Sequence, residues 1–158
     1  MNKTISKTLV AVSAALMIST VALADGEKFG VGVSVNQDTT KIRGTINLDS
    51  TMRLEPFLGF GYTDLNNGSS SNFQIGTGFH LLQPVSSKMS AYYGGYVAFE
   101  NVDNGVASST GFGLGPVAGV EYALDEKFTL GAEVSFAFNF GDNNKFGTNS
   151  EVLLRYYF

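Results

Sequence analysis

Apolar and polar residues alternate with a period of two in eight separate runs along the chain. In one run, every even position from Phe128 to Phe140 is apolar. The odd positions between them hold mostly small, hydroxyl-bearing or charged residues. A period of two predicts β-strands, and no stretch after residue 25 shows the i, i+3, i+4, i+7 spacing of an amphipathic helix. The predicted strands cover residues 29–35, 42–48, 52–62, 73–81, 89–100, 111–122, 128–140 and 151–158.

The two faces of these strands differ in chemistry, and the difference predicts which face is enclosed. One face is dominated by Phe, Tyr, Leu, Val and Ile and carries no charged residue. The lumen of an eight-stranded barrel is only wide enough to be filled by side chains, and the 13 Phe residues of this chain would not fit inside it. A closed barrel also satisfies every backbone polar group in lipid. We therefore predict an all-β fold, an eight-stranded antiparallel up-and-down transmembrane β-barrel with its apolar face outward.

The opposite face combines glycine with six charged residues, which are predicted to lie inside the barrel. A buried charge without a partner is costly, so we expect these residues to pair into a network that plugs the lumen. The alternative interpretation is an ion path or a gate. A hairpin turn at residues 49–51 would set Thr45 opposite Glu55, with Arg43 one diagonal step away. The predicted lumen charge network consists of Arg43, Arg53, Glu55, Glu121, Glu133 and Arg155.

Aromatic residues of the outward face gather near both ends of the predicted strands. Aromatic rings prefer the two interfaces of a membrane, so we expect two girdles. The girdle near the shorter connections holds Phe29, Phe79, Tyr122, Phe128, Tyr156 and Phe158. The girdle near the longer connections holds Tyr62, Phe73, Phe99, Phe112, Phe138 and Phe140.

The connections between the predicted strands alternate in length. The longer set is rich in Asn, Ser, Gly and Asp, and short turns at one end with longer loops at the other are typical of transmembrane barrels. Pro56 and Pro116 fall inside strands, where proline removes a hydrogen-bond donor, so we expect a bulge or a locally broken pair at each. The shorter connections are 49–51, 83–88 and 125–127, and the longer ones are 36–40, 64–71, 101–109 and 141–149.

The first 24 residues have the form of a secretory signal peptide. Lys3 and Lys7 make a basic start, residues 9–21 are mostly apolar, and residues 22–24 read Ala-Leu-Ala before Asp25. A membrane-spanning helix needs roughly 20 apolar residues, and this stretch is shorter and interrupted by Ser and Thr. We predict a signal peptide at 1–24 and one domain, the barrel, at 25–158.

Composition removes several other classes of function. The chain has no Cys and one His, which excludes disulfides, thiolate metal sites and sites that need two imidazoles. Its formal net charge is −4 with no basic run, so a nucleic-acid partner is not expected. We predict no metal and no cofactor, since the acidic and amide residues of the predicted loops lack the spacing of a calcium site. These residues are Asp103, Asn104, Asp142, Asn143 and Asn144.

Two segments and the carboxyl end resemble a known family. Residues 55–62 read EPFLGFGY and residues 115–132 read GPVAGVEYALDEKFTLGA. Both are similar to strands of the small eight-stranded outer-membrane β-barrel family, of the type of the OmpA transmembrane domain and OmpX. The alternation at the end of the chain resembles the family's signal for the outer-membrane barrel assembly machinery, carried here by Val152, Leu154, Tyr156 and Phe158.

The resemblance implies a Gram-negative outer membrane, with its lipids and lipopolysaccharide as surroundings, and we expect a monomer. A non-catalytic structural or surface-interaction role in the cell envelope is the favoured interpretation. A narrow porin-like channel for ions or small solutes is the alternative. A lipid A-modifying enzyme is less favoured, because His80 faces inward and no Ser stands two residues from it. We therefore predict no catalytic residues.

Overall fold

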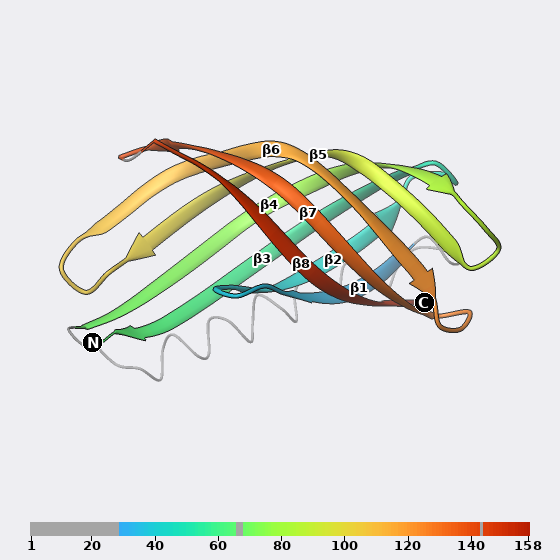
Figure 1. Ribbon diagram of the computed structural model, residues 1–158, viewed down its shortest axis with the longest axis horizontal. Helices are drawn as coiled ribbons and strands as arrows, with labels where there is room; N and C mark the ends of the chain where they lie inside the picture. The colour runs from blue at the N-terminus through green and yellow to red at the C-terminus, as the bar shows by residue number, and fades with distance from the viewer. Residues whose placement is uncertain (1–28, 66–67, 143) are drawn as a thin grey trace.

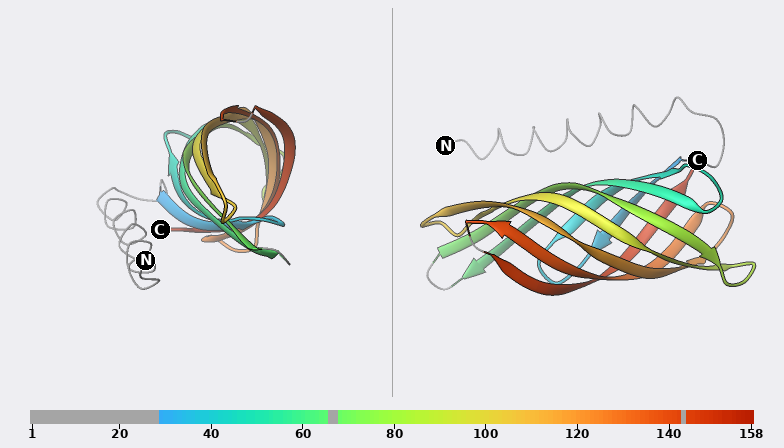
Figure 2. Two further views of the ribbon diagram at one scale, coloured as in Figure 1. Left: turned by 90° about the vertical axis from the view of Figure 1, so that its left-hand side faces the viewer. Right: turned by 90° about the horizontal axis from the view of Figure 1, so that it is seen from above.

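The protein folds into one closed barrel of eight antiparallel β-strands, in which β1 pairs with β8 (Figures 1 and 2). The computed structural model describes residues 29–65, 68–142 and 144–158, so the predicted signal peptide lies outside the described residues. Within that part of the chain, no helix is long and apolar enough to cross a membrane. The strands are β1 (Phe29–Val35), β2 (Thr40–Asn47), β3 (Met52–Leu65), β4 (Gly68–Pro84), β5 (Met89–Asp103), β6 (Ser108–Ala123), β7 (Phe128–Gly141) and β8 (Lys145–Tyr157).

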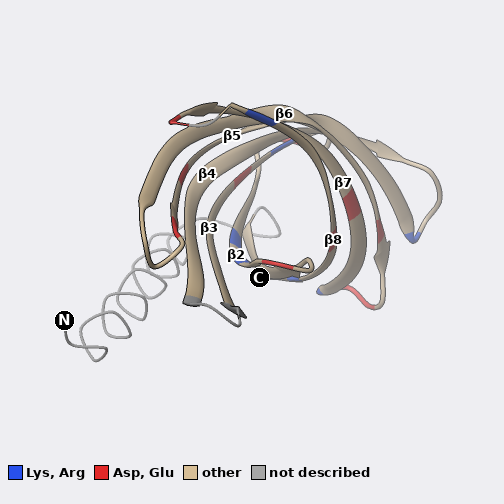
Figure 3. Cartoon of the chain, turned by 60° about the vertical axis from the view of Figure 1, so that its left-hand side comes forward, with Lys and Arg blue, Asp and Glu red and all other residues tan. Residues whose placement is uncertain are grey.

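The exposure of the side chains alternates along each strand, and β7 shows this clearly. Val134 and Phe136 are 52% and 47% exposed, whereas Glu133 and Ser135 beside them are 6% and 7% exposed. β6 has the same pattern over most of its length. Charged positions are few along the wall of the barrel (Figure 3). The predicted fold class is therefore confirmed, with the apolar side chains outward and the charged ones enclosed.

Glycines on the inner face leave room for large side chains from neighbouring strands. A Cβ at Gly119 would lie 2.4 Å from Cζ of Tyr92, and a Cβ at Gly76 would lie 2.6 Å from Cζ of Phe57. Both aromatic side chains are buried. An eight-stranded barrel has only this much interior, so the glycines decide where the large inward side chains can lie.

The predicted difference in loop length between the two ends is wrong. We call the end with the start of β1 and the end of β8 the terminal end, and the opposite one the distal end. The segments predicted as long distal loops mostly continue the strands, and β5 and β6 stay paired as far as Asp103 opposite Ser108. Where both faces of a strand meet water, apolar alternation stops although backbone pairing goes on. The connections are residues 36–39, 66–67, 104–107 and 142–144 at the distal end, and 48–51, 85–88 and 124–127 at the terminal end.

The first hairpin is shorter than the rest of the wall. β1 pairs with β8 only as far as Val35 opposite Val152, and β2 pairs with β3 only as far as Thr40 opposite Phe60. Both β8, which begins at Lys145, and β3 extend further toward the distal end. The distal rim of the barrel is therefore lower along β1 and β2 than around the other strands (Figure 1).

The two prolines inside strands each interrupt one ladder. The pairing of β2 with β3 has a gap at Pro56, and the pairing of β6 with β7 has a gap at Pro116. The pairs on both sides of each gap keep the same register, so neither strand bulges there. On the opposite side, Pro56 is paired with Thr77 and Pro116 with Gly95. The expected locally broken pairs are confirmed, as gaps on one side of each proline, which has no N–H to donate.

Candidate functional site

Four cationic and four acidic side chains meet inside the barrel, and all eight are buried. They project from β2, β3, β6, β7 and β8, and ion pairs join them into one cluster whose formal charges cancel. The six residues predicted for the lumen all belong to it. We call the cluster the charge network: Lys41, Arg43, Arg53, Glu55, Glu121, Glu133, Glu151 and Arg155.

Glu55 on β3 lies at the centre of the charge network, with no exposed surface. Its Oε1 accepts a hydrogen bond from Nε of Arg155 at 2.8 Å, and its Oε2 accepts one from Nη1 of Arg43 at 3.1 Å. Nη1 of Arg53 lies 3.6 Å from the same carboxylate. Thr45 donates to it as well, from Oγ1 at 3.4 Å. Three guanidinium groups therefore share one carboxylate, and Thr45 and Arg43 lie beside Glu55 as predicted.

Arg43 and Glu151 extend the charge network toward the distal end. Nη2 of Arg43 donates to Oε1 of Glu133 at 2.9 Å and to Oε2 of Glu151 at 2.5 Å. Ser34 on β1 joins them, because its Oγ donates to Glu151 at 2.7 Å and accepts from Nε of Arg43 at 3.0 Å. Lys41 completes this part through an ion pair with Glu151. Both carboxylates are thus tied to the same guanidinium.

The terminal part of the charge network is built on Glu121 of β6. Arg53 donates to both carboxylate oxygens of Glu121, from Nη2 at 2.7 Å and from Nη1 at 3.0 Å. Nη1 of Arg155 donates to Oε2 at 3.0 Å. Two-pronged contacts of this kind are the stronger form of the arginine–carboxylate pair. The pair of Arg53 with Glu121 connects β3 with β6, on opposite sides of the lumen.

Tyr92 on β5 fills the space beside these ion pairs. Its hydroxyl donates to Oε2 of Glu133 at 2.9 Å. Its ring centroid lies 5.5 Å from Cζ of Arg155 and 5.9 Å from Cζ of Arg53, within the range of cation–π attraction. The ring of His80 lies 5.0 Å from the same centroid. The charge network therefore has an aromatic side wall and is packed as well as paired.

Glu55, His80 and Glu133 bring three possible metal ligands together, with atoms within 4.8 Å of one another. Nδ1 of His80 is buried without a hydrogen-bond partner, 3.8 Å from Oε2 of Glu55. Both carboxylates, however, already accept hydrogen bonds from Arg43, and Glu55 also binds Arg155. A divalent cation would lie beside two guanidinium groups, so the arrangement favours ion pairs within the chain over metal binding.

Three of the buried side chains described above are absent from the predicted lumen charge network: Lys41, Glu151 and Tyr92. Lys41 lies two residues before Arg43, and Glu151 lies four residues before Arg155, so both have inward parity in the sequence. Tyr92 also occupies an inward position. Inward parity was therefore the signal that could have identified all three. Lys41 was left out because charges were counted only within the apolar runs, and the run on this strand begins at residue 42.

The predicted interface aromatics lie on the outer surface toward the two ends of the barrel. At the terminal end, the ring centroids of Phe128 and Tyr156 are 4.9 Å apart, and toward the distal end those of Phe99 and Phe112 are 5.6 Å apart. The membrane role of all of them stays a prediction. The remaining anchors at outward positions are Phe29, Tyr62, Tyr122 and Phe138, and the outward residues at the carboxyl end are Val152, Leu154, Tyr156 and Phe158.

Solved structures that resemble this fold include small outer-membrane barrels. No family model and no curated protein matches the chain. The crystal structure of neisserial surface protein A is similar with a TM-score of 0.65 and 16% identity, over 82% of this chain and 93% of that one. The N-terminal β-barrel domain of Pseudomonas aeruginosa OprF is similar with a TM-score of 0.57 and 14% identity, over 85% of this chain and 100% of that one. At these identities the likeness shows the fold, and it confirms the predicted architecture.

Proposed function

We propose that this protein is an outer-membrane β-barrel whose lumen is sealed by the charge network. Its role in the cell envelope is structural or one of surface interaction, without catalysis. One observation carries the proposal, namely the separation of an exposed apolar face from an enclosed, electrically balanced interior.

Lipid is the environment that suits the outer face. Monomeric soluble proteins rarely expose contiguous apolar patches larger than a few hundred Å², whereas Leu114, Val134 and Phe136 are all about half exposed here. A charge on this face would cost about 2–4 kcal/mol near the middle of the bilayer. In the described strands, no outward position between the aromatic ends carries a charged residue. Outer-membrane lipids and lipopolysaccharide are therefore the proposed surroundings of a monomeric barrel.

The contacts in the lumen favour a plug over a channel. Every carboxylate of the charge network is held by at least one guanidinium group. The cavity beside His80 and Glu133 measures only about 20 Å³, which is room for about one water molecule. An ion crossing the barrel would have to separate several buried ion pairs at once.

The position of His80 argues against a lipid-modifying enzyme. The side chain is 1% exposed and packs against Tyr92 inside the barrel, so it does not reach the lipid face. A catalytic base for an acyl chain would have to lie within hydrogen-bond reach of the substrate. This supports a non-catalytic role.

Delivery to the outer membrane is proposed to use both ends of the chain. The signal peptide at 1–24 would direct export, and the carboxyl-terminal residues would be read by the barrel assembly machinery. Deletion of Phe158 is expected to move the protein from the outer-membrane to the periplasmic fraction of cells. Phe140→Ala, which removes an aromatic ring from the distal end of the outer face, should leave the distribution unchanged.

Planar-bilayer recording tests the sealed lumen. The purified barrel is expected to give no steady conductance. A steady conductance that disappears in Arg155→Ala or Glu133→Ala would establish the channel instead. Mass spectrometry of lipid A from cells with and without the gene should show no difference, and a missing or added acyl chain would establish an enzyme.

A further inference from the structure

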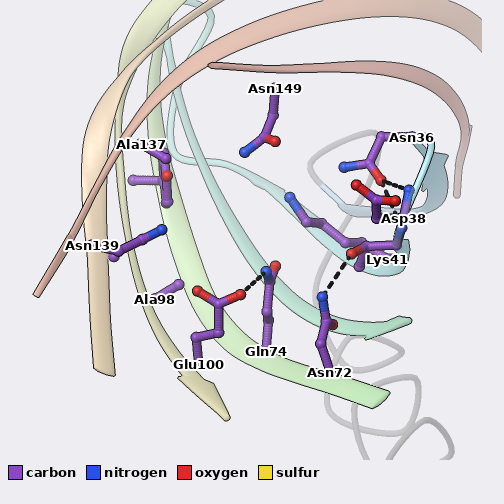
Figure 4. A pocket seen from close by; sticks show the side chains of 13 residues that line it. Asn36, Asp38, Lys41, Asn72, Gln74, Ala98, Glu100, Ala137, Asn139 and Asn149 are labelled. Carbon is purple, nitrogen blue, oxygen red and sulfur yellow. Dashed lines mark hydrogen bonds between the residues drawn. The ribbon is translucent and has the colours of Figure 1, made fainter. Parts of the chain in front are cut away.

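The lumen opens at the distal end into a polar cavity of about 180 Å³, which we call the amide cup (Figure 4). It lies above the charge network, and Lys41 belongs to both. Side chains from β2, β4, β5, β7, β8 and the first hairpin turn line it. Five of them are primary amides: Asn36, Asn72, Gln74, Asn139 and Asn149.

Small residues create the space. Ala98 on β5 is paired with Gly113 on β6, and with Ala137 on β7 they line one side of the amide cup. Lower in the lumen, the inward positions of β5 and β7 hold Tyr92 and Glu133, which fill the barrel. The cup therefore lies where these three neighbouring inward positions hold small residues, while the wall continues.

The amides of the cup are incompletely satisfied within the chain. Nδ2 of Asn72 donates to Oγ1 of Thr39 at 3.2 Å, and Nε2 of Gln74 donates to Oε1 of Glu100 at 3.1 Å. Oδ1 of Asn72 is buried and has no hydrogen-bond partner. Buried polar atoms in folded proteins are paired as a rule, so the amide of Asn72 keeps hydrogen-bonding capacity that the described residues do not use.

The charges of the cup disfavour an anionic ligand. Asp38 and Glu100 have no ion-pair partner among the described residues, so an anion would meet two carboxylates. The one cationic side chain, Lys41, lies at the floor and is held by Glu151.

We propose that the amide cup binds a single neutral sugar residue. Each sugar hydroxyl both donates and accepts hydrogen bonds, as do the paired N–H and C=O groups of an amide side chain. The ring of Tyr96, which also lines the cavity, offers an apolar surface for the C–H face of a pyranose. The volume is below the roughly 300–1,000 Å³ of sites for drug-sized ligands, which limits the occupant to about one ring.

The lowered rim explains how a sugar that is part of a longer chain could enter. β8 continues seven residues past its last pair with β1, and Asn149 lies in that extension. A Cβ at Gly147 would meet no atom within 4 Å, so the space beside the extension is open. The rest of the saccharide would leave sideways over β1 and β2. Sugar binding in the cup would make the proposed surface-interaction role more specific. The inference rests on that role, which supplies the direction from which the saccharide approaches.

Nuclear magnetic resonance of the barrel in dodecylphosphocholine micelles, which contain no sugar, tests the proposal. Titration with methyl β-D-glucopyranoside or methyl β-D-galactopyranoside should shift the side-chain amide signals of Asn72, Gln74 and Asn149 in a saturable way. The expected dissociation constant is on the order of 1–10 mM. Glucuronate, which carries a negative charge, should bind about tenfold more weakly or worse.

Ala137→Leu fills the cup without removing a polar group and should abolish the titration. Ala132→Leu, an outward position on the same strand, is the matched control and should bind the pyranoside as the unchanged barrel does. Both variants should still show the mobility of the folded barrel on unheated gels. An absent or non-saturable shift at about 100 mM pyranoside, tighter binding of glucuronate, or unchanged binding in Ala137→Leu would overturn the proposal.

Barrels in nanodiscs distinguish two sources of the sugar. Lipopolysaccharide with neutral hexoses in its core, compared with a truncated form that lacks them, shows whether a membrane-borne sugar occupies the cup. Shifts with the complete core establish that source, and shifts with the free pyranoside alone establish a soluble saccharide. Failure of sugar binding would leave the sealed lumen intact, because conductance tests that separately.

Discussion

The same barrel wall encloses two polar regions with opposite properties. The charge network holds four cations and four carboxylates, fully paired with one another. The amide cup above it has a cavity of about 180 Å³, and Asp38 and Glu100 there have no ion-pair partner among the described residues. One region is satisfied by the chain itself, whereas the other still offers hydrogen bonds to a ligand.

Side-chain size accounts for much of this difference. In the charge network, the side chains of Tyr92 and Arg155 occupy the space that inner-face glycines leave. In the cup, Ala98 and Ala137 occupy inward positions of the same strands without filling the lumen. A barrel of fixed strand number can thus be plugged at one level and hollow at another.

The largest expected effect comes from removing the central carboxylate of the charge network. Glu55→Gln leaves three guanidinium groups without the charge they share, and breaking a buried ion pair costs about 3–5 kcal/mol. The free energy of unfolding in urea and the heat-modifiable gel transition should both fall. Glu126→Gln, in an exposed turn, is the control and should change little. A stability equal to that of the unchanged barrel would mean that the charge network contributes nothing.

A packing variant tests whether the plugged region is as tightly filled as the distances imply. Gly119→Ala places a Cβ 2.4 Å from Cζ of Tyr92, and overpacking of this kind costs about 1–3 kcal/mol. Gly147→Ala at the distal end meets no atom within 4 Å and should cost less than about 0.5 kcal/mol. Equal unfolding free energies for the two variants would show that the lumen around Tyr92 is loose.

A substitution in the amide cup should lower the unfolding free energy less than a substitution in the charge network does. Gln74→Ala removes the hydrogen bond to the Glu100 carboxylate, and a single bond to a charged group contributes about 1.5–3 kcal/mol. We expect the loss in unfolding free energy not to exceed that range and to stay below the effect of Glu55→Gln. A loss as large as that of Glu55→Gln would make the cup a structural element like the charge network.

The smallest effect is expected at the terminal turns, outside both regions. The carboxylate of Asp125 accepts hydrogen bonds from the backbone N–H groups of Lys127 and Phe128, which lowers its pKa. A pKa lowered by folding stabilises the barrel above the unfolded value, and this contribution disappears as the pH falls through the folded value. Asp125→Asn should therefore weaken the pH dependence of stability below about pH 4. An unchanged acid limb in urea titrations would contradict this.

Alternation along the sequence was sufficient to predict the strands and their inward faces. The reason is physical, since one face had to avoid water and the other had to fit a narrow lumen. Strand ends could not be predicted in this way, because residues such as Ser108 and Lys145 are paired where apolar alternation has already stopped.

The pairs of the charge network were only partly predictable. Arg43 and Glu55 lie on adjacent strands, so hairpin register places them together. Arg53 and Glu121 lie on β3 and β6, which meet only across the closed lumen. That contact depends on how the barrel closes, and no pattern within one strand contains it. The amide cup was missed for the same reason, because its residues come from several strands.

Site-directed spin labelling along β7 measures most directly which face meets lipid. The chain has no Cys, so single cysteines can be introduced without background. Labels at Ala132, Val134 and Phe136 should be accessible to oxygen dissolved in the bilayer, while labels at Ser135 and Ala137 should be protected from it. Accessibility that peaks at Ser135 and Ala137, or that shows no period of two, would contradict the assignment of the apolar face to lipid.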